Sequence, residues 1–256
     1  MSIFLPLAGH LLGDFYLQTN KMAEEKGKSI PQMLLHILVY TVAMAAALFA
    51  GVQPAKVVVP LAVIAGSHLL VDCAMAWGQA KLQKNKKVFW MPFVLYIVDQ
   101  ALHIAVILAV WNSFSLGDVT GGLGAWAIPH WGESLIWNAT VYLFLGLVIL
   151  YPAAITVKKL LDCMPKQPKK LEDGVIAPGA GSNNAGQMIG MLERLIVAVL
   201  VLSNQYGAIA FVMAAKSLAR FKQLEDQDFA EKYLVGTLAS IAIALVFAVV
   251  CGQALK

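Results

Sequence analysis

Long runs without any charged residue constrain the fold of this chain more than any other feature. Four stretches contain no Asp, Glu, Lys or Arg, and three more contain a single aspartate each. About 20 apolar residues are enough for a helix to cross the hydrocarbon core of a bilayer. We therefore expect an all-α fold, a polytopic transmembrane helical bundle of seven to eight helices. The charge-free stretches are 29–55, 134–157, 195–215 and 233–255, and those with one aspartate are 1–20, 57–80 and 88–117.

The composition excludes several other classes of protein. Hydrophobic residues make up 59% of the 256 residues and charged residues only 13%, about half the share in a soluble domain. A disordered chain is excluded, and so is a nucleic-acid partner, because the net charge of +4 is small and scattered. The three distant cysteines indicate neither a disulfide framework nor a zinc knuckle. Membrane lipids are the partners that this composition predicts.

The distribution of Lys and Arg predicts the orientation of the chain in the membrane. Basic residues concentrate in the loops after the first, third and fifth apolar stretches. Because cytoplasmic loops carry an excess of Lys and Arg, we expect these loops in the cytoplasm and the N-terminus in the periplasm of a bacterial inner membrane. Residues 3–20 lack a basic start, so they are expected to be a retained first helix and not a cleaved signal peptide.

The apolar region 191–221 allows two interpretations. It contains a Ser-Asn-Gln-Tyr-Gly turn signal at its centre. A single crossing would place 14 of the 19 basic residues in the cytoplasm and a hairpin would place 17, which favours the hairpin. The hairpin would also pair Glu193 with Lys216. Arg194, Lys216 and Arg220 would then be able to bind lipid headgroups, or they would be ordinary interfacial charges at helix ends.

The domain organisation follows from the positions of the histidines. Residues 1–112 are predicted to form a duplicated two-helix membrane unit that carries most of the histidines and buried aspartates. Residues 113–256 hold the C-terminal membrane helices and a Pro- and Gly-containing cytoplasmic loop, 158–190, within one continuous membrane domain.

A His-x3-Asp motif occurs twice in the first half of the chain. Residues 9–14 read GHLLGD, and residues 67–72 read SHLLVD. The next apolar stretch after each motif contains one further histidine, His36 in the first case and His103 in the second. The same order occurs twice in the same direction along the membrane, which predicts a parallel duplication.

The spacing of these motifs places acid and imidazole on one helix face, because residues i and i+4 are neighbours one turn apart. An aspartate at the centre of a membrane helix costs about 2.5 to 3.5 kcal/mol, so it must be paired, solvated or bound to a cation. No Lys or Arg lies in these four stretches, which leaves the histidines as expected partners. The pairs are His10–Asp14, His68–Asp72 and Asp99–His103.

Neutral imidazole and carboxylate together form a ligand set for Zn, Mn or Fe. We expect one divalent metal site, or two adjacent ones, in the cytoplasmic half of the bundle. Asp99 is predicted to be a ligand or the general base of a hydrolase, and Gln18, Ser67 and Gln100 are predicted to support the ligands or contact substrate. The predicted metal ligands are His10, Asp14, His36, His68, Asp72 and His103.

Two other functions use the same residue types. Intramembrane acids and histidines also line the pathway of a cation- or proton-coupled transporter. Asp–His hydrogen bonds, each worth about 1 kcal/mol or less, can also join the helices of a structural or accessory membrane subunit. The chain contains no Gly-rich phosphate loop, GxSxG or HExxH motif, so its sequence names neither a substrate nor a reaction.

The chain also resembles a known family. The run GHLLGDFYLQ at 9–18, Lys21, His36, the motif at 67–72 and the DQxxH run at 99–103 resemble an uncharacterised bacterial inner-membrane family, a domain of unknown function. The resemblance covers about residues 1–110 and implies a helical membrane fold in that location. Its histidine and aspartate pattern is also similar, by analogy, to that of membrane-bound metal-dependent hydrolases. The later runs Glu193-Arg194, 214–221 and 236–238 resemble a C-terminal extension found in some members.

Overall fold

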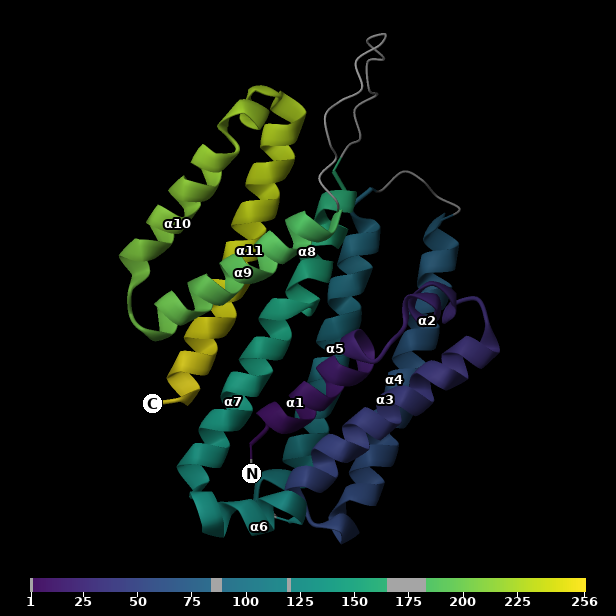
Figure 1. Ribbon diagram of the computed structural model, residues 1–256. Coiled ribbons are helices and arrows are strands. Elements are labelled where there is room, and N and C mark those ends of the chain that lie inside the picture. The colour runs from purple at the N-terminus through teal and green to yellow at the C-terminus, as the bar shows by residue number, and fades with distance from the viewer. Residues whose placement is uncertain (1, 84–88, 119–120, 165–182) are drawn as a thin grey trace. The chain divides into compact units, whose positions relative to one another are not determined.

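Helices make up all the regular structure in the part of the chain that the structure describes (Figure 1). This computed structural model therefore confirms the all-α class. The basic stretch 84–87 and the middle of the predicted loop 158–190 lie outside the described ranges, which are 2–83, 89–118, 121–164 and 183–256.

Five helices in the described ranges are long and apolar enough to cross a membrane, which supports a multi-pass membrane protein. The fourth of them is interrupted at Tyr151, where α7 ends and α8 begins with Pro152. The predicted count of seven to eight spans is not confirmed. The five are α3 (Ile30–Gly51), α4 (Pro54–Gln83), α5 (Met91–Ser113), α7 with α8 (Glu133–Leu150 and Pro152–Asp162) and α11 (Gln227–Ala254).

The first predicted span, 3–20, is shorter in the structure. It consists of α1 (Phe4–Leu11) followed by η1 (Leu12–Tyr16), a short π-helix with a bond of 2.9 Å from the N–H of Leu17 to the carbonyl of Leu12. At 1.5 Å per residue the two are about 20 Å long, whereas the hydrocarbon core is about 30 Å thick. The duplicated repeat is also not confirmed, because the first motif runs from α1 into a π-helix and the second lies within α4.

The predicted turn within 191–221 is confirmed. Helix α9 (Asn183–Leu202) ends there and α10 (Tyr206–Ala219) begins, with Asn204 between them in the left-handed region at φ 55°. Asparagine tolerates this conformation better than most residues, which explains the turn signal in the sequence.

The chain divides into two compact units, Met1–Leu147 and Val148–Ala254, with the boundary inside α7. The predicted division at 112/113 stays a prediction. In the first unit, α3 packs against α1, η1 and α4, and α4 packs against α5. The unit also contains α2 (Asn20–Glu25), η2 (Leu116–Asp118) and α6 (Gly122–Trp131).

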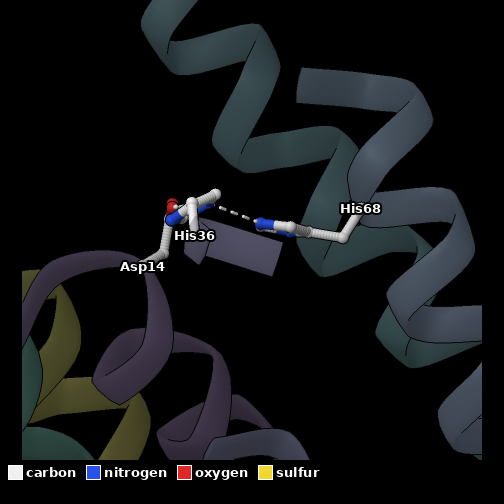
Figure 2. A group of neighbouring side chains, drawn as sticks. All are labelled: Asp14, His36 and His68. Carbon is white, nitrogen blue, oxygen red and sulfur yellow. Dashed lines mark hydrogen bonds and ion pairs between the residues drawn. The ribbon is translucent and has the colours of Figure 1, made fainter. Parts of the chain in front are cut away.

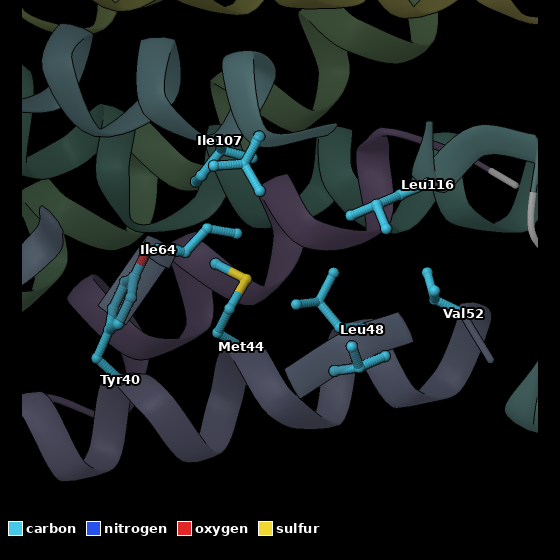
Figure 3. Close-up of a cluster of buried hydrophobic side chains, with 9 residues drawn as sticks. Tyr40, Met44, Leu48, Val52, Ile64, Ile107 and Leu116 are labelled. Carbon is cyan, nitrogen blue, oxygen red and sulfur yellow. The ribbon is translucent and has the colours of Figure 1, made fainter. Parts of the chain in front are cut away.

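A buried apolar cluster joins the three long helices of the first unit (Figure 3). Its side chains extend from Tyr40 along one face of α3 and meet residues of α4, α5 and η2. Burial of this surface fixes α3, α4 and α5 as neighbours, and so positions the polar residues one turn beyond the cluster. Its members are Tyr40, Met44, Leu48, Val52, Val57, Ile64, Ile107, Val110 and Leu116.

Two glycines allow the first helix to approach α3 closely. A Cβ at Gly9 would lie 2.6 Å from the Cβ of Ala47, and a Cβ at Gly13 would lie 2.9 Å from Cδ2 of Tyr40. Small residues four apart permit such close backbone contact between membrane helices. The same contact brings His10 and Asp14, which flank these glycines, against α3.

In the second unit, α11 packs against α8 and α9, and α9 packs against α10. A short 3-10 helix, η3 (Phe221–Glu225), connects α10 to α11. Gly236 of α11 faces Leu161 of α8, where an added Cβ would lie 3.2 Å from a leucine methyl group. A small residue thus again allows a close helix contact.

Candidate metal centre in the first unit

The structure brings the predicted intramembrane histidines and aspartates of the first unit into one cluster. Six of the seven residues are buried, with exposed fractions of 6% or less. The side chain of the seventh, Asp99, is 15% exposed. The cluster lies nearer the end of the bundle where α3 and α5 begin and α4 ends. Its residues are His10 from α1, Asp14 from η1, His36 from α3, His68 and Asp72 from α4, and Asp99 and His103 from α5.

His36 occupies the middle of this cluster. Figure 2 shows the Asp14 carboxylate beside its ring and His68 approaching from the other side. Its Nε2 lies 3.1 Å from Nε2 of His68, 3.0 Å from Oδ2 of Asp72 and 3.5 Å from Oδ1 of Asp14. Residues from η1, α3 and α4 therefore direct their ligand atoms to one point.

Lys26 also enters the cluster, which corrects the expectation that only histidines could partner the aspartates. Its Nζ lies 3.0 Å from Oδ2 of Asp72, 3.5 Å from Oδ1 of Asp14 and 3.3 Å from Nε2 of His36. The residue follows α2 in a loop, and its long aliphatic stem lets the ammonium reach the buried acids. The only sign of this contact in the sequence is that Lys26 lies in the loop that follows the span containing Asp14.

The charge of Lys26 is held by its surroundings. Burial alone lowers the pKa of an ammonium, but the carboxylates of Asp14 and Asp72 outweigh this effect, so the pKa of Lys26 lies above its ordinary value. Lys26 is therefore a fixed positive charge at neutral pH, and its side chain remains 22% exposed.

The π-helical turn η1 positions Asp14. A π-turn widens the helix, and such turns are frequent at functional sites. Asp14 lies in the middle of this turn and is buried, while Phe15 next to it packs into the interior. Thr19 then ends the extended connection by capping α2, since its hydroxyl accepts a bond of 3.2 Å from the N–H of Met22. This local sequence turns the chain so that Lys26 returns toward Asp14.

Gln100 connects three members of the cluster. Its Nε2 donates to Oδ2 of Asp14 at 2.9 Å and to Oδ2 of Asp99 at 3.1 Å. Its Oε1 can then only accept, so Nε2 of His10, 3.2 Å away, carries the proton. Nδ1 of His10 accepts from the Tyr40 hydroxyl at 3.3 Å. Both ring nitrogens of His10 are thus engaged in hydrogen bonds in this arrangement.

His103 differs from His10, because it carries its proton on Nδ1 and leaves Nε2 without a hydrogen-bond partner in the described ranges. Its Nδ1 lies 2.8 Å from the backbone carbonyl oxygen of Asp99, which can only accept, so Nδ1 carries the proton. In the neutral ring Nε2 therefore presents a lone pair; this nitrogen has no hydrogen-bond partner among the described residues and lies 4.0 Å from Oδ1 of Asp72. Metal-binding histidines usually donate their other ring N–H to a carbonyl or carboxylate in this way.

Two overlapping groups of residues could hold a metal ion. One is Asp14 with His36 and His68, and the other is His68 with Asp72 and His103. Within each group the ligand atoms all lie within 4.8 Å of one another. Zinc–nitrogen bonds of 2.0–2.1 Å place tetrahedral ligands about 3.4 Å apart, so binding would require only small side-chain movements.

Two further predicted residues lie outside the hydrogen-bond network of the cluster in the described ranges. The hydroxyl of Ser67 donates to the carbonyl of Ile64 in its own helix at 2.9 Å. Gln18 lies beyond η1, and its buried Oε1 has no hydrogen-bond partner among the described residues. The structure brings neither side chain into hydrogen-bond contact with the cluster in the described ranges, and their predicted roles stay predictions.

The three basic residues predicted to bind headgroups in the second unit each contact a different partner. Lys216 forms the predicted ion pair with Glu193, which is confirmed. Arg194 is buried and donates to the backbone carbonyls of Ile149 and Leu150, at the end of α7. Arg220 donates to Oε1 of Gln223 at 3.0 Å. Headgroup binding by these three basic residues stays a prediction.

The fold and the cluster together define a class, namely helical, multi-pass membrane proteins with a buried histidine and aspartate cluster able to hold a metal ion. Residues 3–120 match the family described as "Protein of unknown function (DUF3307)". The matched range contains every residue of the cluster and Lys26, and it confirms the resemblance to an uncharacterised family. No curated protein and no solved structure matches the chain.

Proposed function

We propose that this protein is a metal-dependent hydrolase of a bacterial inner membrane that acts at the cytoplasmic leaflet. A divalent ion (Zn, Mn or Fe) would be bound by His68, Asp72 and His103. The observation that carries the proposal is the buried Nε2 lone pair of His103, aimed toward Asp72 while Nδ1 is held by a backbone carbonyl. A purely structural histidine would be expected to use both of its nitrogens in hydrogen bonds.

A metal ion with three protein ligands has a coordination position left for water or substrate. Catalytic zinc sites typically keep a fourth position open for water or substrate, whereas structural sites fill all four. A divalent ion in such a site polarises an acyl or phosphoryl oxygen and activates water. Oδ1 of Asp99 is buried without a hydrogen-bond partner in the described ranges and lies 3.7 Å from Nδ1 of His103. Asp99 stays the proposed general base, but this contact lies beside the ring nitrogen opposite the one that would bind the ion.

The other residues of the cluster would support this ion. Gln100 holds Asp14 and Asp99 through its amide and holds His10 through its carbonyl. His10, Asp14 and His36 would thus surround the ion without all contacting it. Because the basic loops are proposed to face the cytoplasm, the substrate would be a membrane lipid or another molecule reaching that leaflet. In the second unit, Lys216 and Arg220 are the proposed headgroup contacts, whereas Arg194 is buried and its donors are engaged within that unit.

Elemental analysis of purified protein tests the metal centre. We expect about one divalent ion per chain in the wild type and loss of that ion in His103→Ala. His130→Ala is the matched control, because His130 lies in α6 and its Nδ1 bonds to the carbonyl of Trp126. That variant should keep its metal. A wild type that is stable, folded and free of metal would contradict the proposal.

The contacts of Lys26 favour a second candidate, a structural or accessory membrane subunit. An ammonium within 3.0 Å of Asp72 and 3.5 Å of Asp14 neutralises buried acids without any metal. In that case, Ala substitutions in the cluster would lower stability without changing the metal content. The elemental analysis above separates the two candidates, since only the metal centre predicts an ion that His103→Ala removes.

A further inference from the structure

The two candidate ligand groups differ in their relation to Lys26. Its ammonium contacts two of the three residues of the Asp14–His36–His68 group, at 3.5 Å from Oδ1 of Asp14 and 3.3 Å from Nε2 of His36. The structure gives it no contact with His103, whose Nε2 stays without a hydrogen-bond partner in the described ranges. In the first group the ammonium thus lies against ligand atoms of two residues, whereas in the second it contacts only Oδ2 of Asp72 among the described residues and leaves Nε2 of His103 without a partner.

A metal ion and this ammonium cannot use the same ligand atoms. An imidazole nitrogen has one lone pair, so Nε2 of His36 ligates a metal only if it neither accepts a hydrogen bond from Lys26 nor carries a proton donated to Asp72. Two cations a few ångströms apart also repel each other strongly in a site with little water. Asp72 allows both cations, because its Oδ2 faces Lys26 at 3.0 Å while its Oδ1 faces His103 at 4.0 Å.

The balance of charge agrees with one ion. Asp14, Asp72 and Asp99 carry three negative charges when ionised, and Lys26 compensates one of them. One divalent ion would compensate the remaining two. With Lys26 in place, a second divalent ion would leave two excess positive charges among these buried side chains, against one without Lys26, and uncompensated buried charge is costly.

We propose that Lys26 is a built-in cation that closes the Asp14–His36–His68 group to metal, so that the centre holds one divalent ion and not two. This inference rests on the proposed metal centre and specifies its stoichiometry. Removing the ammonium would free Oδ2 of Asp72, which with Asp14 and His36 supplies a second ligand set. With Lys26 present, only one of the two possible metal sites can be occupied.

The test measures bound Mn²⁺ per chain in the detergent-purified protein after dialysis against increasing Mn²⁺. We expect binding to saturate at one ion per chain in the wild type and at two in Lys26→Met. Methionine keeps the length of the stem without the charge, and its thioether is a poor ligand for Mn²⁺. Lys28→Met, an exposed lysine in the same loop, is the matched control and should bind one ion.

A spectroscopic measurement supports the count. Two Mn²⁺ ions bound to the two carboxylate oxygens of Asp72 would be close enough for magnetic coupling, which electron paramagnetic resonance detects. We expect an uncoupled signal in the wild type and a coupled one in Lys26→Met.

The outcomes separate this inference from the function on which it rests. One ion in both the wild type and Lys26→Met would overturn the role of Lys26 and leave the metal centre intact. Two ions in the wild type would overturn it as well, whether or not the variant folds. No ion in the wild type would overturn the metal centre itself.

Discussion

Lys26 and Arg194 each bring a positive charge into the interior of one unit, but their surroundings differ. Lys26 faces the carboxylates of Asp14 and Asp72 and the ring of His36. Arg194 donates to the carbonyls of Ile149 and Leu150 and to the hydroxyl of Ser240. A compact ammonium thus lies among possible metal ligands, whereas a planar guanidinium spans the end of an interrupted helix.

This difference indicates how to separate a chemical site from a structural one. The final carbonyls of a helix lack partners within that helix, and Arg194 supplies donors to two of them at the end of α7. That role requires hydrogen-bond donors and no titratable partner. The contacts of Lys26 instead involve groups that ligate metals or transfer protons. Buried charge alone is therefore a weak sign of function, and the chemistry of the surrounding groups is the stronger one.

The largest expected effect comes from Asp72→Asn in the first unit. Asp72 is 4% exposed and faces Lys26 on one oxygen and His103 on the other. Removing one partner of a buried ion pair costs about 3–5 kcal/mol, and the metal would lose a ligand. We expect both a lower free energy of unfolding and metal-free protein. Chemical unfolding in detergent and elemental analysis measure the two, and a variant that keeps its ion would remove Asp72 from the metal centre.

Arg194→Met in the second unit should affect stability alone. It leaves buried carbonyls without their donor, at about 1–3 kcal/mol each, so we expect a loss of about 2–3 kcal/mol in the free energy of unfolding. The metal content should stay at that of the wild type. Arg220→Met is the control, since Arg220 is half-buried and bonds locally to Gln223, and it should change stability by about 0.5 kcal/mol or less. Loss of metal in Arg194→Met would contradict a purely structural role for Arg194.

A smaller effect is expected from Gly13→Ala, which tests how the cluster is positioned. The new Cβ would lie 2.9 Å from Cδ2 and 3.0 Å from Cα of Tyr40. Overpacking of this kind costs about 1–3 kcal/mol. Gly66→Ala in α4 is the matched control, because nothing lies within 4 Å of its added Cβ and alanine favours helix. Thermal unfolding should show a loss in the first variant and none in the second, and equal behaviour would contradict the close helix contact.

Much of the fold follows from the distribution of charge along the sequence. Charge-free stretches predicted helices, and the structure places long apolar helices in most of them. Hydropathy counts apolar residues but does not report where a helix changes its hydrogen-bonding pattern. The π-turn at Asp14 and the cap at Thr19 shorten the first predicted span for that reason. The turn at Asn204 was predictable because its residues favour left-handed backbone.

The candidate site was predictable to the extent that helix geometry determines it. A spacing of four residues aligned His68 with Asp72, and similar depths in the membrane brought α3, α4 and α5 residues together. Lys26 was not predicted because it lies in a loop outside the apolar stretches, and the loop position does not reveal that its long side chain reaches the buried acids. Which histidine offers a lone pair depends on Gln100 and on a backbone carbonyl, and neither contact can be read from spacing.

The smallest expected effect, from Tyr40→Phe, separates support from ligation within the cluster itself. The variant removes the hydroxyl that donates to Nδ1 of His10 and keeps the ring, which stacks on His68 with ring centres 3.5 Å apart. Loss of one hydrogen bond should cost about 1 kcal/mol, with the metal retained. Tyr142→Phe, at a residue that is 52% exposed, should have no effect on either quantity. Because His10 uses both nitrogens in hydrogen bonds, loss of metal in Tyr40→Phe would instead place His10 among the ligands.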